Sequence, residues 1–178
     1  MNILTKRLSI REITKDDWQG LQKIAADFRK SEYAIYDMPL PTDDEKIREL
    51  TSRFAESKLF FAVFSADSAE MIGYICFHND QERYDLGYCF NSAYHGKGYA
   101  FEGCTALMEY IAQTYVVTCF TAGTALKNIP SCRLLEKLGF VQTGTETLSF
   151  HKDEDGNDIV FEGGIFVKEQ SLIEIKSK

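Results

Sequence analysis

Two glycines, separated by one residue, stand directly before a segment with helical periodicity. Gly96 and Gly98 follow an apolar stretch that ends near Phe90, and apolar residues then recur at helical spacing over 100–111. The first amides of a helix have no partner inside the helix, and glycine lets an anionic group approach the backbone closely. These residue types and their spacing predict a site for a phosphate or pyrophosphate, to which Lys97 would add a positive charge.

Two common nucleotide-binding motifs do not fit this loop. The P-loop pattern G-x-x-x-x-G-K-[ST] is not present in it. The dinucleotide fingerprint G-x-G-x-x-G fails because Phe101 stands where its third glycine should be. The strands before the loop also read as an antiparallel meander, not as a βαβ unit. On these residues alone, a glycine-bearing loop without a ligand remains an alternative.

Hydrophobic periodicity around the loop predicts one domain over residues 1–178, with seven strands and about four helices. The expected strands are 7–13, 59–65, 71–78, 84–90, 116–121, 140–150 and 159–168. The expected helices are 14–29, one beginning at Thr42, 98–114, and one between Asn128 and Gly139. This order predicts a mixed α/β (α+β) layer fold with a mostly antiparallel seven-stranded sheet.

Composition and charge argue against several classes of protein. The 178 residues carry a formal net charge of −7, which disfavours a nucleic-acid binder that neutralises phosphates. No apolar run approaches the roughly 20 residues of a membrane span, and no signal peptide is recognisable. The five cysteines form no C-x-x-C pair, so we expect buried free thiols and no metal site. We therefore expect a cytoplasmic protein with no membrane or nucleic-acid partner.

The loop sequence His95-Gly96-Lys97-Gly98-Tyr99-Ala100 resembles a family motif. It is similar to the coenzyme A pyrophosphate loop, [QR]-x-x-G-x-[GA], of the GNAT superfamily of N-acetyltransferases. Gly98 and Ala100 match this pattern, whereas His95 departs from the usual Gln or Arg.

A second resemblance lies further along the chain. Residues 128–131 (NIPS) and 135–140 (LEKLGF) are similar to the N-x-x-S and E-K-x-G-F elements of the ribosomal-protein N-terminal acetyltransferase branch (RimJ/RimL-like). The opening run 7–11 (RLSIR) is similar to the first strand of that branch. The resemblance therefore spans nearly the whole chain in the right order, and it implies a GNAT-like fold.

The resemblance implies that acetyl-CoA is the co-substrate and donates the acetyl group. In the family, main-chain amides of the loop and of the helix start hold the pyrophosphate. The corresponding residues here are His95, Gly96, Lys97, Gly98, Tyr99 and Ala100.

For the pantetheine arm, the resemblance implies that the fourth strand splays from the fifth near its end. The main chain of Tyr88, Cys89 and Phe90 would then pair with pantetheine. An amide there, of Cys89 or Phe90, would polarise the thioester carbonyl. Asn128 and Ser131 would lie near the pantetheine arm and the thiol.

The implied reaction is direct attack of a neutral amine on the acetyl carbonyl. Ser131 is the candidate proton donor to the leaving thiolate, although it could equally be an ordinary serine in a helix first turn. Related enzymes use a tyrosine four residues later, where this chain has Leu135. An acyl-enzyme on Cys89 is disfavoured because no histidine lies near it in the sequence. The candidates for the base are water, Asp85, Glu146, His151 and, less strongly, His78.

The acceptor is an amine of unspecified kind: a protein N-terminus, an amino sugar, a polyamine or an aminoglycoside. Tyr33, Tyr36 and Met38 are expected to shape its pocket, and Asp37 and residues 43–45 either attract a cation or simply begin a helix. Two alternatives stay open, a non-catalytic acyl-CoA-binding module and a transferase that uses a different acyl-CoA. The chain is expected to be a monomer or a homodimer.

Overall fold

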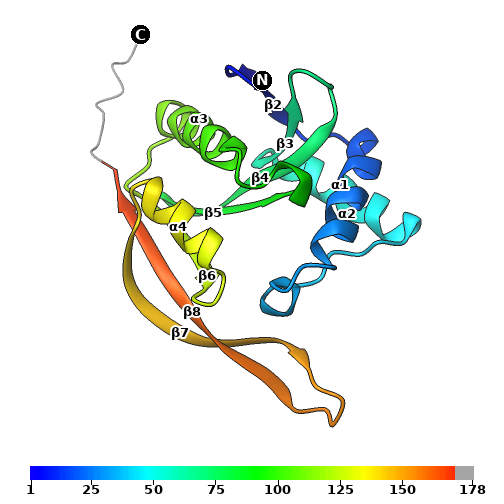
Figure 1. The fold of residues 1–178 in the computed structure, drawn as a ribbon. Helices are drawn as coiled ribbons and strands as arrows, with labels where there is room; N and C mark the ends of the chain where they lie inside the picture. The colour runs from blue at the N-terminus through cyan, green and yellow to red at the C-terminus, as the bar shows by residue number, and fades with distance from the viewer. Residues whose placement is uncertain (171–178) are drawn as a thin grey trace.

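A computed structural model describes residues 1–170 and shows one mixed sheet with helices on both faces (Figure 1). The sheet has eight strands in the order β1-β2-β3-β4-β5-β6-β8-β7. The strands are β1 (Asn2–Leu4), β2 (Leu8–Glu12), β3 (Phe60–Ser65), β4 (Met71–Asp80), β5 (Arg83–Phe90), β6 (Cys119–Ala125), β7 (Val141–Lys152) and β8 (Asp158–Glu169). The α-helices are α1 (Trp18–Phe28), α2 (Asp44–Ser57), α3 (Tyr99–Thr114) and α4 (Ile129–Lys137).

The expected mixed, mostly antiparallel fold is confirmed, with one strand more than the seven predicted. The additional strand, β1, is three residues long and pairs antiparallel with β2 at the edge of the sheet. A strand this short gives almost no alternation pattern in the sequence. Three 3₁₀ turns, η1 (Lys15–Asp17), η2 (Ala34–Tyr36) and η3 (Ser92–Tyr94), complete the elements of the described residues.

The two helix pairs cover opposite faces of the sheet (Figure 1). On one face, Leu107 of α3 and Leu135 of α4 are fully buried against alternate strand residues such as Phe120. On the other face, Leu21 of α1 and Ile47 of α2 are equally buried. Alternating side chains on one strand therefore enter two separate cores.

One strand pair opens in the middle of the sheet. β5 and β6 are the parallel pair, and their register covers only Arg83↔Cys119, Tyr84↔Phe120 and Asp85↔Thr121. On its other side, β5 pairs antiparallel with β4 along its full length, as far as Phe90. The edge of β5 beyond Asp85 is thus left without a strand partner on the β6 side, and this opening positions the site.

Several predicted boundaries shift in the structure. The fifth expected strand, 116–121, is observed as Cys119–Ala125. The second helix is capped by Asp43, whose carboxylate accepts from the Lys46 amide, and not by Thr42. The capping box of Thr14 is confirmed, and it opens the η1 turn ahead of α1. No helix in residues 1–170 is both long and apolar enough to cross a bilayer.

Candidate active site

The glycine loop adopts the backbone that an anion site requires. Gly96 and Gly98 have φ of +70° and +82°, whereas Lys97 and Tyr99 keep negative φ, so the sign alternates along the loop. Such alternation turns successive main-chain N–H groups toward one concave point, a nest for an anion. Gly98 is the N-cap of α3, and a Cβ at Gly96 would meet nothing within 4 Å. The loop therefore presents amides to open space at a helix start.

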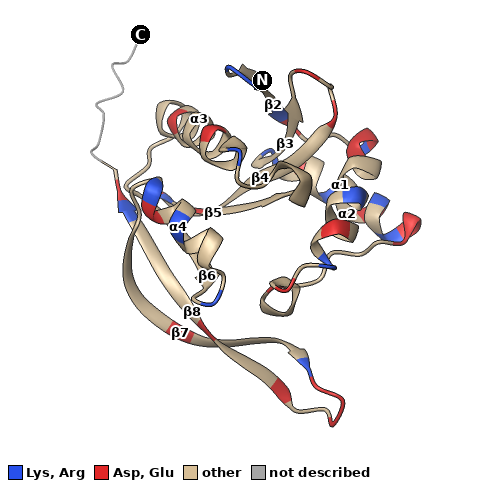
Figure 2. Cartoon of the chain, viewed as in Figure 1, with Lys and Arg blue, Asp and Glu red and all other residues tan. Residues whose placement is uncertain are grey.

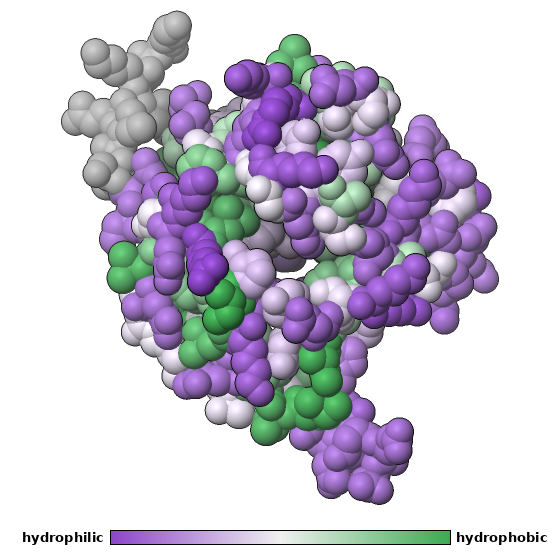
Figure 3. All heavy atoms as spheres, viewed as in Figure 1, coloured by the Kyte–Doolittle hydropathy of each residue, from purple (hydrophilic) through white to green (hydrophobic). Residues whose placement is uncertain are grey.

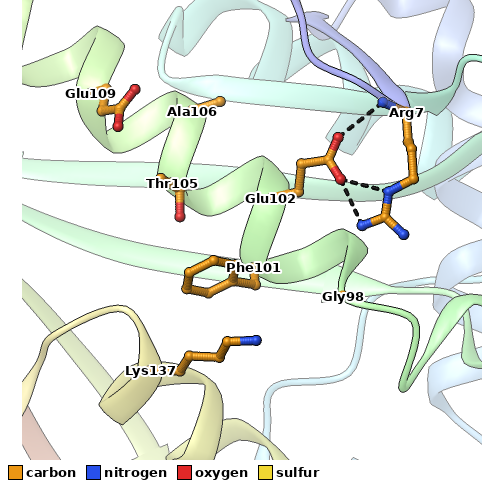
Figure 4. A pocket seen from close by; sticks show the side chains of 8 residues that line it. All are labelled: Arg7, Gly98, Phe101, Glu102, Thr105, Ala106, Glu109 and Lys137. Carbon is orange, nitrogen blue, oxygen red and sulfur yellow. Dashed lines mark hydrogen bonds and ion pairs between the residues drawn. The ribbon is translucent and has the colours of Figure 1, made fainter.

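Arg7 ties this loop to the start of the sheet. Its Nη1 donates to the Lys97 carbonyl at 2.8 Å. Its Nε donates to Glu102 Oε2 at 2.7 Å (Figure 4). Its guanidinium also lies 4.4 Å from the centroid of the Tyr99 ring. Burial acts to raise the pKa of Glu102, but hydrogen bonds from Thr5 and Arg7 outweigh it and lower that pKa. Glu102 is thus an ionised partner that holds Arg7 against the first turn of α3.

A cavity of about 450 Å³ adjoins the loop on the outer side of α3. Arg7 and Gly98 line one end of it, and Lys137 of α4 lies across from Phe101 with its Nζ 4.4 Å from the ring centroid (Figure 4). The other lining residues are Glu102, Thr105, Ala106 and Glu109. Figure 2 marks Lys and Arg positions in blue along the ribbon of α4, which runs beside α3. Sequence analysis did not anticipate the contribution of Arg7 or Lys137, since neither residue belongs to the glycine loop.

Two residues of the loop take positions that their types alone did not reveal. The Lys97 ammonium donates to the Ala93 carbonyl at 2.9 Å and is exposed, so its charge is held beside the η3 turn. His95 Nε2 lies 2.7 Å from the Phe90 carbonyl oxygen. A carbonyl can only accept, so Nε2 carries the hydrogen. His95 therefore joins the loop to the end of β5.

The strand register decides which main-chain groups of β5 face the opening. The Asn91 amide donates to the Ile72 carbonyl, and the register pairs Cys89 with Tyr74. Hydrogen-bonded pairs alternate along an antiparallel ladder, so the Cys89 main chain bonds to β4, and that of Tyr88 and Phe90 points toward β6. Of the two amides considered for the thioester carbonyl, the register directs that of Phe90 into the opening.

The Cys89 side chain lies on the α1/α2 face and is not activated as a nucleophile. It packs with the core that includes Tyr74. Burial, followed by the charges of Asp37 and Asp27, raises the pKa of Cys89 to about 12. A thiol of that pKa is almost entirely protonated at neutral pH. This agrees with the sequence analysis, in which an acyl-enzyme on Cys89 is disfavoured.

Ser131 lies in the first turn of α4, and the structure brings a tyrosine to it. The Asn128 Oδ1 accepts from the Ser131 amide at 3.3 Å, as predicted for a helix cap. The phenol oxygen of Tyr88 is 2.8 Å from Ser131 Oγ. Leu135, one turn later, is completely buried. Sequence reasoning considered only the main chain of Tyr88; its place in the alternation with Leu86 and Phe90 would have directed its side chain toward α4.

The expected acceptor loop meets the β7–β8 hairpin. His151 Nε2 lies 2.9 Å from the Asp37 carbonyl oxygen, and the Tyr36 and Phe161 rings pack edge to face at 5.2 Å. Figure 3 shows a hollow near the middle of this face of the molecule, with hydrophobic side chains gathered below it. Burial raises the pKa of Asp37, against the Met38 amide and His151, which lower it. Burial also raises the pKa of Tyr74, and the charges of Cys89, Cys76 and, least of the four causes, Asp37 add to this effect.

Three further candidate bases lie on strands β4, β5 and β7. Asp85 Oδ1 accepts from Thr121 Oγ1 at 2.7 Å, at the last rung of the β5–β6 pair. His78 is the register partner of Asp85 on β4. Glu146 is exposed on β7, opposite Gly163 of β8. The structure therefore groups Asp85 with His78 and places Glu146 on a separate strand.

Comparison with known proteins identifies the family. The sequence matches the acetyltransferase (GNAT) domain over residues 7–141. It is 32% identical over 146 residues to the uncharacterised N-acetyltransferase YnaD of Bacillus subtilis, covering 81% of this chain and 85% of YnaD. It is 33% identical over 92 residues to the ribosomal protein uS5-alanine N-acetyltransferase of Escherichia coli, covering 49% of this chain and 47% of that protein.

The structural comparison agrees. RimL, a ribosomal-protein acetyltransferase solved in complex with coenzyme A, superposes with a TM-score of 0.80 at 15% identity, covering 97% of this chain and all of RimL (100%). The expected likeness to the RimJ/RimL branch is confirmed by these relatives. The chain belongs to the GNAT family of acetyltransferases, enzymes that use acetyl-CoA.

Proposed function

We propose that the enzyme transfers the acetyl group of acetyl-CoA directly to a primary amine. The observation that carries this proposal is the opening between β5 and β6, with the glycine loop at one end of it and Ser131 at its side. The loop amides of residues 96–100 would hold the pyrophosphate, and the free edge of β5 would pair with the pantetheine arm. The thioester would then end beside Ser131.

The cavity next to Gly98 suits the nucleotide end of coenzyme A. Arg7 and Lys137 supply positive charge at its rim, and Phe101 supplies an aromatic face. A purine ring can stack on such a face, and a phosphate on ribose would pair with either cation.

Transfer requires stabilisation of a tetrahedral oxyanion and of a leaving thiolate. The Phe90 amide, which points into the opening, is the proposed oxyanion donor. Ser131 is the proposed donor to the sulfur. A coenzyme A thiolate resembles that of a free cysteine, whose pKa is about 8.5, so protonation assists its departure without being obligatory.

Two carboxylates on the acceptor side are proposed to receive the proton of the amine, directly or through water. Asp85 lies where the opening begins, and Asp37 lies on the loop that faces the β7–β8 hairpin. Burial raises the pKa of Asp37, which makes it a stronger base than an ordinary carboxylate. An anionic acceptor side also attracts an ammonium before it loses its proton.

The acceptor itself is proposed only as a primary amine. A relative acts on a ribosomal-protein alanine, so peptides with N-terminal alanine belong among the candidates, beside polyamines and amino sugars. A single domain, a cytoplasmic location, a monomer or homodimer and the lack of a nucleic-acid partner stay predictions from the sequence.

The test is acceptor-dependent release of coenzyme A thiol from acetyl-CoA, with a titration of coenzyme A binding alongside. The acceptor panel contains alanine- and serine-terminated peptides, spermidine, glucosamine and kanamycin. Release with one acceptor and not with its N-acetylated form would establish the reaction. Tight binding without release for any acceptor would support a binding module instead, and no binding would refute the placement of the cofactor.

A further inference from the structure

The side chain of Tyr88 joins the open edge of β5 to the first turn of α4. Its phenol oxygen lies 2.8 Å from Ser131 Oγ and 3.4 Å from the Ser131 carbonyl oxygen. Over residues 1–170, no other side chain has a polar atom within hydrogen-bonding distance of Ser131 Oγ. The direction of the Ser131 hydroxyl therefore depends on Tyr88.

The direction of this hydrogen bond follows from the partners available. Each hydroxyl has one proton, and a phenol is a stronger donor than an aliphatic hydroxyl. If Ser131 donated, the Tyr88 proton would be left with the Ser131 carbonyl at 3.4 Å, the longer contact. If Tyr88 donates across 2.8 Å, the Ser131 proton is free to point into the opening. The second arrangement uses the shorter contact and the stronger donor.

Burial keeps the Tyr88 phenol protonated, so that it can donate a hydrogen bond. Its ring packs against the core beneath α3 and α4. Burial raises the pKa of Tyr88 above its ordinary value, and the bond to Ser131 only partly opposes this. The phenol thus keeps its proton throughout the neutral range, so it cannot act as a base.

The main chain of the same residue borders the expected position of the thioester. The Tyr88 amide and carbonyl point toward β6, on the part of β5 that has no strand partner there. One residue therefore sets both the edge along which pantetheine would lie and the orientation of the hydroxyl that meets its sulfur.

We propose that Tyr88 is a positioning residue for acetyl transfer: its phenol donates to Ser131 Oγ and directs the Ser131 proton at the sulfur of coenzyme A. This inference rests on the function proposed above. Attack by the amine forms the C–N bond, and collapse of the intermediate breaks the C–S bond and leaves its electron pair on sulfur. The Ser131 proton moves to that sulfur, and Ser131 is reprotonated by the proton that the amine lost, carried by water. Tyr88 keeps its proton and stabilises the charge that develops on Ser131 Oγ.

The test is a double-mutant cycle of Tyr88→Phe and Ser131→Ala with acetyl-CoA and the best acceptor of the panel. Tyr88→Phe keeps the ring and is expected to lower kcat about fivefold, the effect of one neutral hydrogen bond. Ser131→Ala is expected to lower it about 100-fold, at the low end for a general acid. The matched control is Tyr110→Phe, since Tyr110 packs against the same core.

If Tyr88 acts through Ser131, the double variant is no slower than Ser131→Ala, and coenzyme A affinity is unchanged in all variants. A purely structural role predicts instead the same fivefold loss in both backgrounds, with lower Tm and weaker coenzyme A binding, and this would overturn the proposal. An undiminished kcat in Tyr88→Phe would also overturn it, while leaving the proposed function intact. A wild-type enzyme that transfers acetyl to no acceptor would remove the proposed function itself, and this inference with it.

Discussion

Replacing Gly98 with alanine should separate coenzyme A binding from folding. The φ of +82° at this position is in the left-handed region, where a Cβ costs about 1 kcal/mol. The added Cβ would lie 3.5 Å from Arg7 Nη2, an ordinary contact, so no further clash is expected inside the protein. For a chain of this size, a loss of about 1 kcal/mol lowers Tm by about 2–4 °C. The fold should therefore survive Gly98→Ala.

The same substitution should reduce the affinity for coenzyme A far more than it reduces stability. The Cβ added by Gly98→Ala would enter the cavity beside the loop. If the backbone relaxed to a less strained φ at this position, the loop amides would no longer point together at the pyrophosphate. We expect Kd for coenzyme A to rise at least tenfold, which is about 1.4 kcal/mol. Isothermal titration calorimetry measures this directly, and a thermal melt of the same sample measures stability.

A second glycine provides the matched control. Gly156 has φ of +85°, and a Cβ there would meet nothing within 4 Å, in the turn between β7 and β8. Gly156→Ala should lower Tm to the same degree and leave coenzyme A affinity unchanged. Equal affinities for the two variants would refute the assignment of the loop as the pyrophosphate site. A Gly98→Ala protein that fails to fold would refute the strain estimate.

Three further predictions concern chemistry and acid stability. Cys89→Ala should keep kcat within about twofold, because burial raises the pKa of the thiol to about 12 and leaves almost no nucleophile; an acetylated Cys89 in a mass spectrum would contradict this. Asp37→Asn should lower kcat/KM for the acceptor at least about tenfold without changing coenzyme A affinity, whereas the control Asp67→Asn, in the turn after β3, should change neither constant. Glu102 has a lowered pKa in the folded protein, so its contribution to stability is present above the ordinary pKa of about 4.3 and is lost as the pH falls through the folded value. The Tm difference between the wild type and Glu102→Gln should thus be largest near pH 7 and shrink below about pH 4.

The parts of the site that depend on local sequence were predictable. Gly96 and Gly98 indicate the loop because only glycine adopts positive φ readily. Asn128 indicates the start of α4 because a helix cap needs a short polar side chain. The order of strands and helices followed from hydrophobic periodicity in the same way. These signals act within a few residues, where the physics is set by neighbours along the chain.

The contacts that join distant segments were not predictable. Tyr88 and Ser131 are 43 positions apart, and Arg7 and Glu102 are 95 apart, so neither pair leaves a pattern in any short window of sequence. Lys137 belongs to the LEKLGF motif, but its place across from Phe101 depends on how α4 packs beside α3. Such pairings need the register and the helix packing, which only the fold supplies.

The gap between β5 and β6 also bears on the lifetime of the protein. Main-chain groups of β5 beyond Asp85 that face β6, apart from the Phe90 carbonyl held by His95, must be hydrated when the site is empty, and a ligand that pairs with them takes the place of a strand. Because such a ligand binds the folded chain and not the unfolded one, the free energy of unfolding rises with its concentration. Resistance to proteolysis should then increase as coenzyme A is added, so that the abundance of the enzyme in a cell would follow the supply of its own co-substrate.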